Sequence, residues 1–143
     1  MRKIKGLVIM LLISLSLFGP TGCQEDGGST DINANTTVST FSYEQINAEE
    51  AKEIMDSGVE HIIIDARTDE EFAQGHIEGA ILIPEYEIAD RAEKELPDKD
   101  ALILVYCRSG RRSKIASDEL VNLGYSNVKE FGGIIDWPYE IVK

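Results

Sequence analysis

The apolar residues of this chain form two kinds of pattern, which alternate along the sequence. Ala101–Val105 is a continuous apolar run, which predicts a strand buried on both faces, as in a parallel sheet. The run leads directly into Cys107. Five residues later an amphipathic helix is indicated by apolar residues that share one face, namely Ile115, Ala116, Leu120 and Leu123. A strand, a short loop and a helix are therefore expected in immediate succession.

The same alternation extends over the chain from Phe41 onward. Further strands are expected at Tyr43–Ile46, His61–Asp65, Ala80–Ile83 and Asn127–Glu130. Helices are expected between them, starting at Asn47, at Thr68 and at Glu85, with Glu50 and Glu71 completing capping boxes at the first two. Because strands alternate with helices, the chain is predicted to be an α/β protein, with a parallel central sheet of about five strands and helices on both faces.

The first 40 residues differ in composition from the rest. Residues 1–22 begin with Arg2, Lys3 and Lys5 and continue with the apolar stretch Gly6–Phe18, whose 13 residues are too few to span a bilayer as a helix, which needs about 20. We interpret them as an export signal peptide. Residues 23–40 are polar and predict a flexible tether, so that the folded domain covers residues 41–143.

Small residues before Cys23 resemble the bacterial lipobox, in which the cysteine is lipidated and becomes the mature N-terminus. The match is imperfect, because Pro20 occupies the position where the pattern has an aliphatic residue. The resemblance implies a lipid-anchored protein on the outer face of the bacterial cell membrane, with secretion after ordinary cleavage as the alternative. A lipidated Cys23 would also leave Cys107 without a disulfide partner.

Charge changes the picture in two ways. The net charge of −12 includes a basic start, and residues 23–143 carry 11 basic against 26 acidic side chains, a balance of −15 that argues against nucleic-acid binding. Yet four of those eleven basic residues surround Cys107, namely Arg108, Arg111, Arg112 and Lys114. Since charges beyond about 8 Å are largely screened, this local positive field should still attract an anion.

Cys107 and its loop are the strongest candidate site. A strand-to-helix loop of an α/β sheet lies at the carboxyl edge, where ligands bind, and the following helix N-terminus offers free N–H groups and about half a positive charge. Lowering a cysteine pKa from roughly 8.5 to about 6.5 needs ~2.7 kcal/mol, more than the dipole alone provides. Loop N–H groups and arginine charge are therefore expected to supply much of it. The alternative is an inert, buried structural cysteine.

The loop resembles that of single-domain rhodaneses, the thiosulfate sulfurtransferases, whose active loop runs Cys-Arg-x-Gly-x-Arg/Thr. Four residues match it: Cys107, Arg108, Gly110 and Arg112. A second family signature is matched at every place by Asp65, Arg67, Glu71, Phe72, Gly75, His76, Ile77, Gly79 and Ala80. The family also shows a Gly-Gly…Trp element, present here as Gly132, Gly133 and Trp137.

The resemblance implies the rhodanese-like fold and transfer of sulfane sulfur in two displacements. Cys107 would attack thiosulfate, expel sulfite and keep a persulfide, which cyanide or a thiol then accepts. The substrate anion would be bound by the active loop, which comprises Arg108, Ser109, Gly110, Arg111 and Arg112, with Arg108 and Arg112 on its sulfonate end. Arg108 favours thiosulfate over mercaptopyruvate, since the mercaptopyruvate enzymes tend to have glycine there. No cofactor is implied.

Two other functions stay open. Cysteine phosphatases and arsenate reductases have five residues between Cys and Arg, whereas Arg112 follows Cys107 after four, so the loop is short for phosphate. A rhodanese-like domain can also act as a persulfide carrier without turnover, or merely bind proteins. The intact Cys107 and its basic loop argue against a protein-binding module without chemistry.

Other polar residues are interpreted as structural. Asp65 and Arg67 at a strand end are expected to fix the backbone through hydrogen bonds. His76 is the alternative general base, but nothing in the sequence puts it near Cys107. His61 and His76 have no metal-ligand spacing with each other or with cysteine, so no metal site is predicted. Trp137 is expected to pack against the domain rather than line the sulfur pocket.

Overall fold

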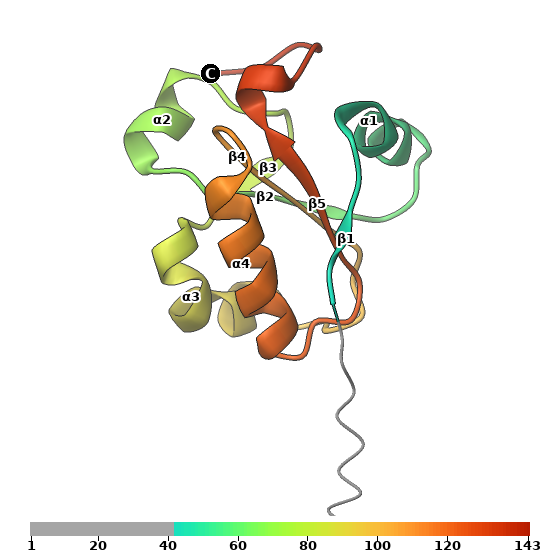
Figure 1. The fold of residues 1–143 in the computed structure, drawn as a ribbon, viewed down its shortest axis with the longest axis vertical. Helices are drawn as coiled ribbons and strands as arrows, with labels where there is room; N and C mark the ends of the chain where they lie inside the picture. The colour runs from blue at the N-terminus through green and yellow to red at the C-terminus, as the bar shows by residue number, and fades with distance from the viewer. Residues whose placement is uncertain (1–41) are drawn as a thin grey trace, which may run out of the picture. The chain divides into compact units, whose positions relative to one another are not determined.

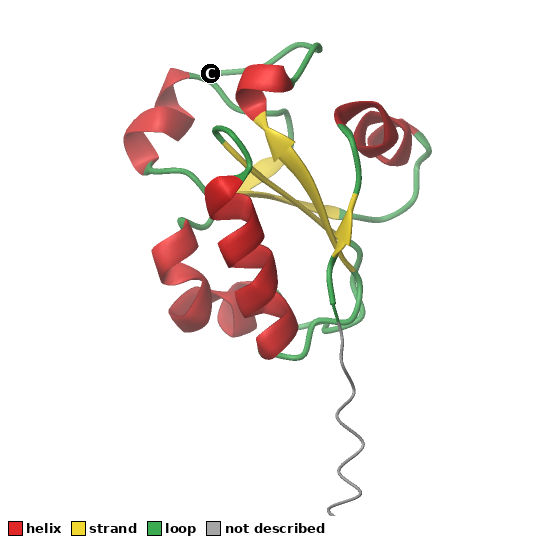
Figure 2. Cartoon of the chain, in the orientation of Figure 1, coloured by secondary structure: helices red, strands yellow, loops and turns green. Residues whose placement is uncertain are grey.

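The computed structural model describes residues 42–143, which form one parallel five-stranded sheet between layers of helices (Figures 1 and 2). The strand order is β1-β5-β4-β2-β3, and every pairing between them is parallel. The strands are β1 (Glu44–Gln45), β2 (Ile62–Asp65), β3 (Ala80–Leu82), β4 (Ile103–Cys107) and β5 (Val128–Gly133). The predicted fold class is confirmed.

Helices cover both faces of the sheet. One face carries α1, and the other carries α3 and α4 (Figure 1). The helices are α1 (Ala48–Asp56), α2 (Asp69–Gln74), α3 (Ile88–Glu95) and α4 (Arg111–Asn122), with short 3₁₀ turns η1 (Glu85–Glu87) and η2 (Ile134–Asp136). Two apolar clusters fill the space between the layers, one on each face. All five residues of β4 are buried, as its unbroken apolar sequence predicts.

Local sequence signals explain where the helices start. Asn47 caps α1 and Thr68 caps α2, and each forms a full capping box, with Glu50 and Glu71 respectively. The helix expected from Glu85 begins instead as the 3₁₀ turn η1 and becomes α-helical only at Ile88. Pro84 comes directly before η1, and its ψ of 144° is not helical.

The carboxyl ends of the strands bring the signature residues to one edge of the sheet. Asp65 ends β2, Cys107 ends β4 and Gly133 ends β5. The register between β4 and β5 shifts between Val105 and Cys107, since Val105 pairs with Glu130 but Cys107 pairs with Gly133. One extra residue of β5 is therefore accommodated beside the end of β4, which is a β-bulge.

The predictions for the N-terminal part lie outside the described residues. These are the signal peptide at 1–22, the tether at 23–40 and lipidation of Cys23, and they stay predictions. Between residues 42 and 143, no helix is both long enough and apolar enough to cross a membrane.

Candidate functional site: the Cys107 loop

Cys107 lies at the end of β4, directly below the turn that leads into α4. Its sulfur accepts a hydrogen bond from the backbone N–H of Gly110, at 3.2 Å from nitrogen to sulfur. Gly110 is the N-cap residue of α4 and takes the left-handed conformation, at φ 93°, which turns the chain back over the sulfur. Cys107 itself is only 1% exposed, so its sulfur is buried under the turn.

The surroundings of the sulfur favour its ionised form on balance. Burial by itself raises the pKa of the Cys107 thiol, but the hydroxyl of Ser113 and the backbone N–H groups of Ser113, Ser109 and Gly110 lower it by more. The result is a pKa below the ordinary value for cysteine. Hydrogen-bond donors are the largest of the groups that stabilise the thiolate, and the charge of Arg112 acts on it as well.

The loop rests directly on the bulge of β5. A Cβ atom built on Gly133 would lie 2.2 Å from the carbonyl oxygen of Arg108 and 2.5 Å from Cα of Ser109, so only glycine allows this approach. Gly132 has a φ of 89° and lies against Gly110. The two glycines allow this close backbone approach, and it holds the turn over Cys107.

Two polar residues below the loop were missed by sequence reasoning. Ser113, in the first turn of α4, is fully buried and places its hydroxyl 2.6 Å from Oε1 of Glu130. Glu130 on β5 is 3% exposed and also accepts the N–H of Gly132 at 2.9 Å. The available signal was a charged residue at the end of the predicted strand Asn127–Glu130, because a charged residue that is buried there needs a partner inside the fold.

The five predicted anion-binding residues surround the turn but differ in exposure. Arg108, Ser109 and Arg111 are exposed, and Gly110 is buried beside the sulfur. Arg112 is only partly exposed and makes a bidentate ion pair with Glu71 of α2, at 2.6 and 2.8 Å. The pKa of Arg112 is raised, chiefly by this pairing and to a smaller extent by the charge of the Cys107 thiolate, so its charge does reach the site.

The pair between Arg112 and Glu71 connects α2 to the active loop. Arg112 holds the pKa of Glu71 at about 2, well below the ordinary 4.5, through their hydrogen bonds. Both side chains are less than a quarter exposed, so water screens the pair only in part. The pair fixes the guanidinium of Arg112 instead of leaving it fully available to an anion.

We expect Glu71→Gln to lower the free energy of unfolding by about 1–2 kcal/mol at neutral pH. The depressed pKa of the wild-type carboxylate contributes stability that is present above pH 4.5 and is lost as the pH falls toward about 2. Urea unfolding at a series of pH values measures this, and the two proteins should converge in acid. Glu70→Gln, an exposed neighbour in the same turn, is the control. Equal stability at neutral pH would contradict the prediction.

The other signature residues build a buried scaffold beside the site. Asp65 accepts hydrogen bonds from the side chain of Arg67 and, at 2.5 Å, from the hydroxyl of Tyr106. Arg67 also donates to the carbonyl oxygen of Gly75, 2.7 Å away. The structural role expected for Asp65 and Arg67 agrees with this geometry. His76 stacks on Phe72 and pairs with Val142 in an isolated antiparallel bridge.

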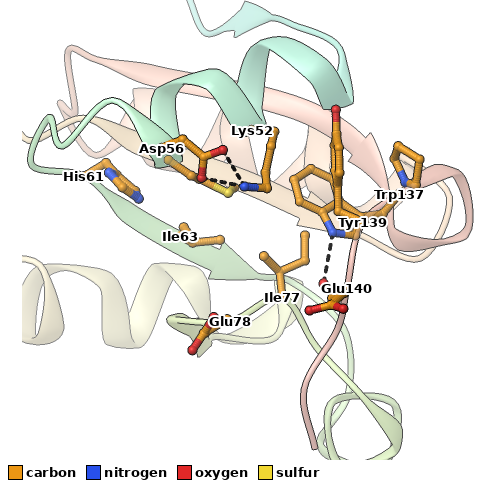
Figure 3. Close-up of a pocket in the computed structure, with 11 residues that line it drawn as sticks. Lys52, Asp56, His61, Ile63, Ile77, Glu78, Trp137, Tyr139 and Glu140 are labelled. Atoms are coloured by element: carbon orange, nitrogen blue, oxygen red, sulfur yellow. Dashed lines mark hydrogen bonds and ion pairs between the residues drawn. The ribbon is translucent and has the colours of Figure 1, made fainter.

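Two cavities lie near these elements. The smaller, of about 450 Å³, is beside the active loop, and Arg108, Ile135 and Ile141 are among the residues that line it. The larger, of about 760 Å³, is shown in Figure 3 and contains no residue of the loop. Trp137 lines this second cavity and packs against Phe131, so it is a packing residue rather than part of the sulfur site.

No group of three or more His, Cys, Asp or Glu side chains in residues 42–143 is arranged to hold a metal ion. The chemistry that the described geometry offers is that of a single activated sulfur, with N–H donors on one side and basic side chains around it.

Comparison with known protein families shows which family this chain belongs to. The model of the rhodanese-like domain matches residues 47–138, which is more than half of the chain. The chain belongs to the rhodanese-like sulfurtransferase family. The match covers both the Asp65 signature and the Cys107 loop.

Relatives in the rhodanese family differ in what they are named for. The thiosulfate sulfurtransferase PspE of Escherichia coli is 41% identical over 80 residues, which cover 56% of this chain and 77% of that protein. A sulfurtransferase of Allochromatium vinosum is 37% identical, over 65% of this chain and 86% of its own length. A candidate sulfur carrier protein, YrkF of Bacillus subtilis, is 35% identical, and the chain spans about half of it (55%).

Solved structures support the same rhodanese fold. A structure described as an E. coli rhodanese with anions is 38% identical, with a TM-score of 0.55, over 58% of this chain and 98% of that one. The protein SSP1007 of Staphylococcus saprophyticus is 29% identical, with a TM-score of 0.63, over 70% of this chain and 99% of that one.

Proposed function

We propose that this rhodanese-like protein is a thiosulfate sulfurtransferase that works through a persulfide on Cys107. The observation that carries the proposal is the sulfur at the N-terminus of α4, which accepts the N–H of Gly110 at 3.2 Å and has a lowered pKa. An ionised sulfur is the nucleophile that attack on thiosulfate requires. The name of the relative PspE supports thiosulfate as the donor.

The reaction proceeds in two displacements. The Cys107 thiolate attacks the outer sulfur of thiosulfate, a new S–S bond forms, and sulfite leaves with the electron pair of the old one. Cyanide or a thiolate then attacks the terminal sulfur of the persulfide, and the Cys107 thiolate is the leaving group. The loop N–H groups that lower the pKa of Cys107 serve both steps, since they stabilise negative charge at this position.

Arg108 is the best-placed residue for the sulfonate end of thiosulfate. Its side chain is exposed, lines the cavity beside the loop and, within residues 42–143, takes part in no salt bridge. Arg112 has Glu71 as its partner, so it contributes through its charge rather than as the first contact. A guanidinium matches the planar arrangement of two sulfonate oxygens, which favours such an anion.

The proposal is tested by mass spectrometry of the full chain after incubation with thiosulfate. The peptide that contains Cys107 should gain the mass of one sulfur atom, and cyanide should remove it with release of thiocyanate. Loading of Cys107 with slow release to cyanide would favour the carrier role that the name of YrkF suggests. Phosphatase activity without an adduct would favour the phosphatase alternative. If the Cys107 adduct does not form and no thiocyanate is released, the proposal is refuted.

We further propose that the protein works outside the cell, held at the membrane by a lipid on Cys23. The basic start of residues 1–22, the apolar stretch after it and the small residues before Cys23 support export. The polar residues 24–40 would have an r.m.s. span of very roughly 20–25 Å, which keeps the domain near the membrane without burying it.

A further inference from the structure

Glu130 is a buried carboxylate in direct contact with the active loop, and the sulfur transfer proposed above gives it no role. It lies on β5 between β4 and β1, where it pairs with Val105 and with Gln45. Only 3% of the residue is exposed, and a Cβ built on Gly110 would lie 3.9 Å from Oε1. A buried carboxylate costs free energy unless something compensates it, so its place below the loop calls for a reason.

The compensation comes from hydrogen bonds rather than from a cation. Within residues 42–143 Glu130 takes part in none of the salt bridges, and its Oε1 accepts the N–H of Gly132 and the hydroxyl of Ser113. The positive end of α4 is the other favourable charge nearby. Cys107 depends on that same helix end and on that same hydroxyl, so the carboxylate and the thiolate share their stabilising groups.

The Ser113 hydroxyl has a single proton to donate. Its shortest contact is with Oε1 of Glu130, at 2.6 Å, whereas the carbonyl oxygens of Gly110 and Gly132 lie 3.0 and 3.3 Å away. A charged acceptor also makes the stronger hydrogen bond. In residues 42–143 this hydroxyl makes no hydrogen bond to Sγ of Cys107, and it lowers the pKa of the thiol only where its proton turns from Glu130 to the sulfur. The two acceptors therefore compete for one proton.

We propose that Glu130 is a positioning residue of the sulfur site, which competes with Cys107 for the Ser113 hydroxyl and so limits how strongly the sulfur is stabilised. This inference rests on the proposed function only in that it takes Cys107 as the reacting group. A thiolate that accepts fewer hydrogen bonds has a higher pKa. It is also more nucleophilic, because the nucleophilicity of a thiolate decreases as its pKa decreases, with a Brønsted coefficient of about 0.4–0.5. Glu130 would thus preserve the reactivity of a sulfur that the loop has already ionised.

The test compares the pKa of Cys107 in the full chain before and after Glu130→Gln. Glutamine keeps an acceptor oxygen for Ser113 and Gly132 but lacks the negative charge. We expect the pKa of Cys107 to fall by at least about half a unit. The limiting alkylation rate at high pH should fall as well, since the thiolate is better stabilised. Iodoacetamide labelling against pH, read on the separate peptides of Cys107 and Cys23, measures both.

A second background separates positioning from simple charge. In a Ser113→Ala protein, Glu130→Gln should shift the pKa of Cys107 by less than half as much, because the shared proton is gone. Glu44→Gln on the neighbouring strand β1 removes an exposed acid and should leave the pKa of Cys107 unchanged. The other titratable or charged groups around this pair stay intact in these variants: they are Tyr43, just before β1, Asp118 and Arg112 of α4, Glu71 of α2 and Glu85 of η1.

An unchanged pKa of Cys107 in Glu130→Gln would overturn the inference. An equal shift in both backgrounds would also overturn it, because Glu130 would then act by its charge alone. If circular dichroism shows that Glu130→Gln is not folded, Glu130→Asp is the replacement variant. It withdraws the carboxylate by one methylene, so it should release the Ser113 hydroxyl and lower the pKa of Cys107 as well. None of these measurements uses thiosulfate, so failure here and failure of the proposed sulfur transfer are separate results.

Discussion

Replacing Cys107 with serine is expected to abolish thiosulfate-dependent sulfur transfer, with a loss of at least about three orders of magnitude, while the domain stays folded. A serine hydroxyl ionises far less readily than a thiol and forms no persulfide, so both displacements lose their reacting atom. The fold should survive because serine is slightly smaller and its oxygen can accept the same N–H of Gly110. Thiocyanate formation measures activity, and urea unfolding measures stability.

The second cysteine of the chain provides the matched control. Cys23→Ser removes the same chemical group from the predicted N-terminal attachment site, outside the folded domain. Its purified protein should form thiocyanate at the wild-type rate. Wild-type transfer by Cys107→Ser would contradict the assignment of the nucleophile. Loss of transfer in both variants would indicate instead that sulfur passes between the two cysteines.

The sequence predicted the layout of the fold because period and capping are local properties. The unbroken apolar run at Ala101–Val105 requires burial on both faces, and only a central strand offers that. The capping boxes at Asn47 and Thr68 specify helix starts through contacts three residues apart. The antiparallel bridge between His76 and Val142 escaped prediction, since it joins single residues that are far apart in the chain.

The site was predicted in position but not in its contacts. A strand followed by a helix fixes where Cys107 lies, and Gly110 at the turn fixes how the chain returns over it. The partner of Arg112 is 41 residues away, and the partner of Ser113 is 17 residues away. Nothing local determines such pairs, because they depend on how α2 and β5 pack against α4. The arginine-rich sequence therefore did not reveal that Arg112 is paired with Glu71.

Burial of the sulfur has the same origin. Gly132 and Gly133 let the turn that follows Cys107 pack directly on the end of β5. The sulfur then accepts the backbone N–H of Gly110, and only 1% of Cys107 is exposed. The glycine pair indicates close approach in the sequence, yet only the structure identifies the active loop as the segment that approaches.

Gly133→Ala is expected to cause the second-largest change, with a loss of stability of about 3 kcal/mol or more, or displacement of the active loop. The added Cβ would lie 2.2 Å from the carbonyl oxygen of Arg108, and the backbone of Arg108 and Ser109 leaves it no room. Since φ of Gly133 is −131°, alanine is compatible with the local conformation, and the effect is purely steric. Urea unfolding and the alkylation pKa of Cys107 measure the two consequences.

Gly79→Ala distinguishes this steric effect from a general cost of replacing glycine. Gly79 has a φ of 80°, and a Cβ there would meet no atom within 4 Å, so only backbone strain of about 1 kcal/mol is expected. The pKa of Cys107 should stay at its wild-type value in Gly79→Ala. In Gly133→Ala it should rise, because a raised loop takes the N–H of Gly110 away from the sulfur. Equal behaviour of the two variants would mean that the close approach of the loop to β5 does not hold the donors in place.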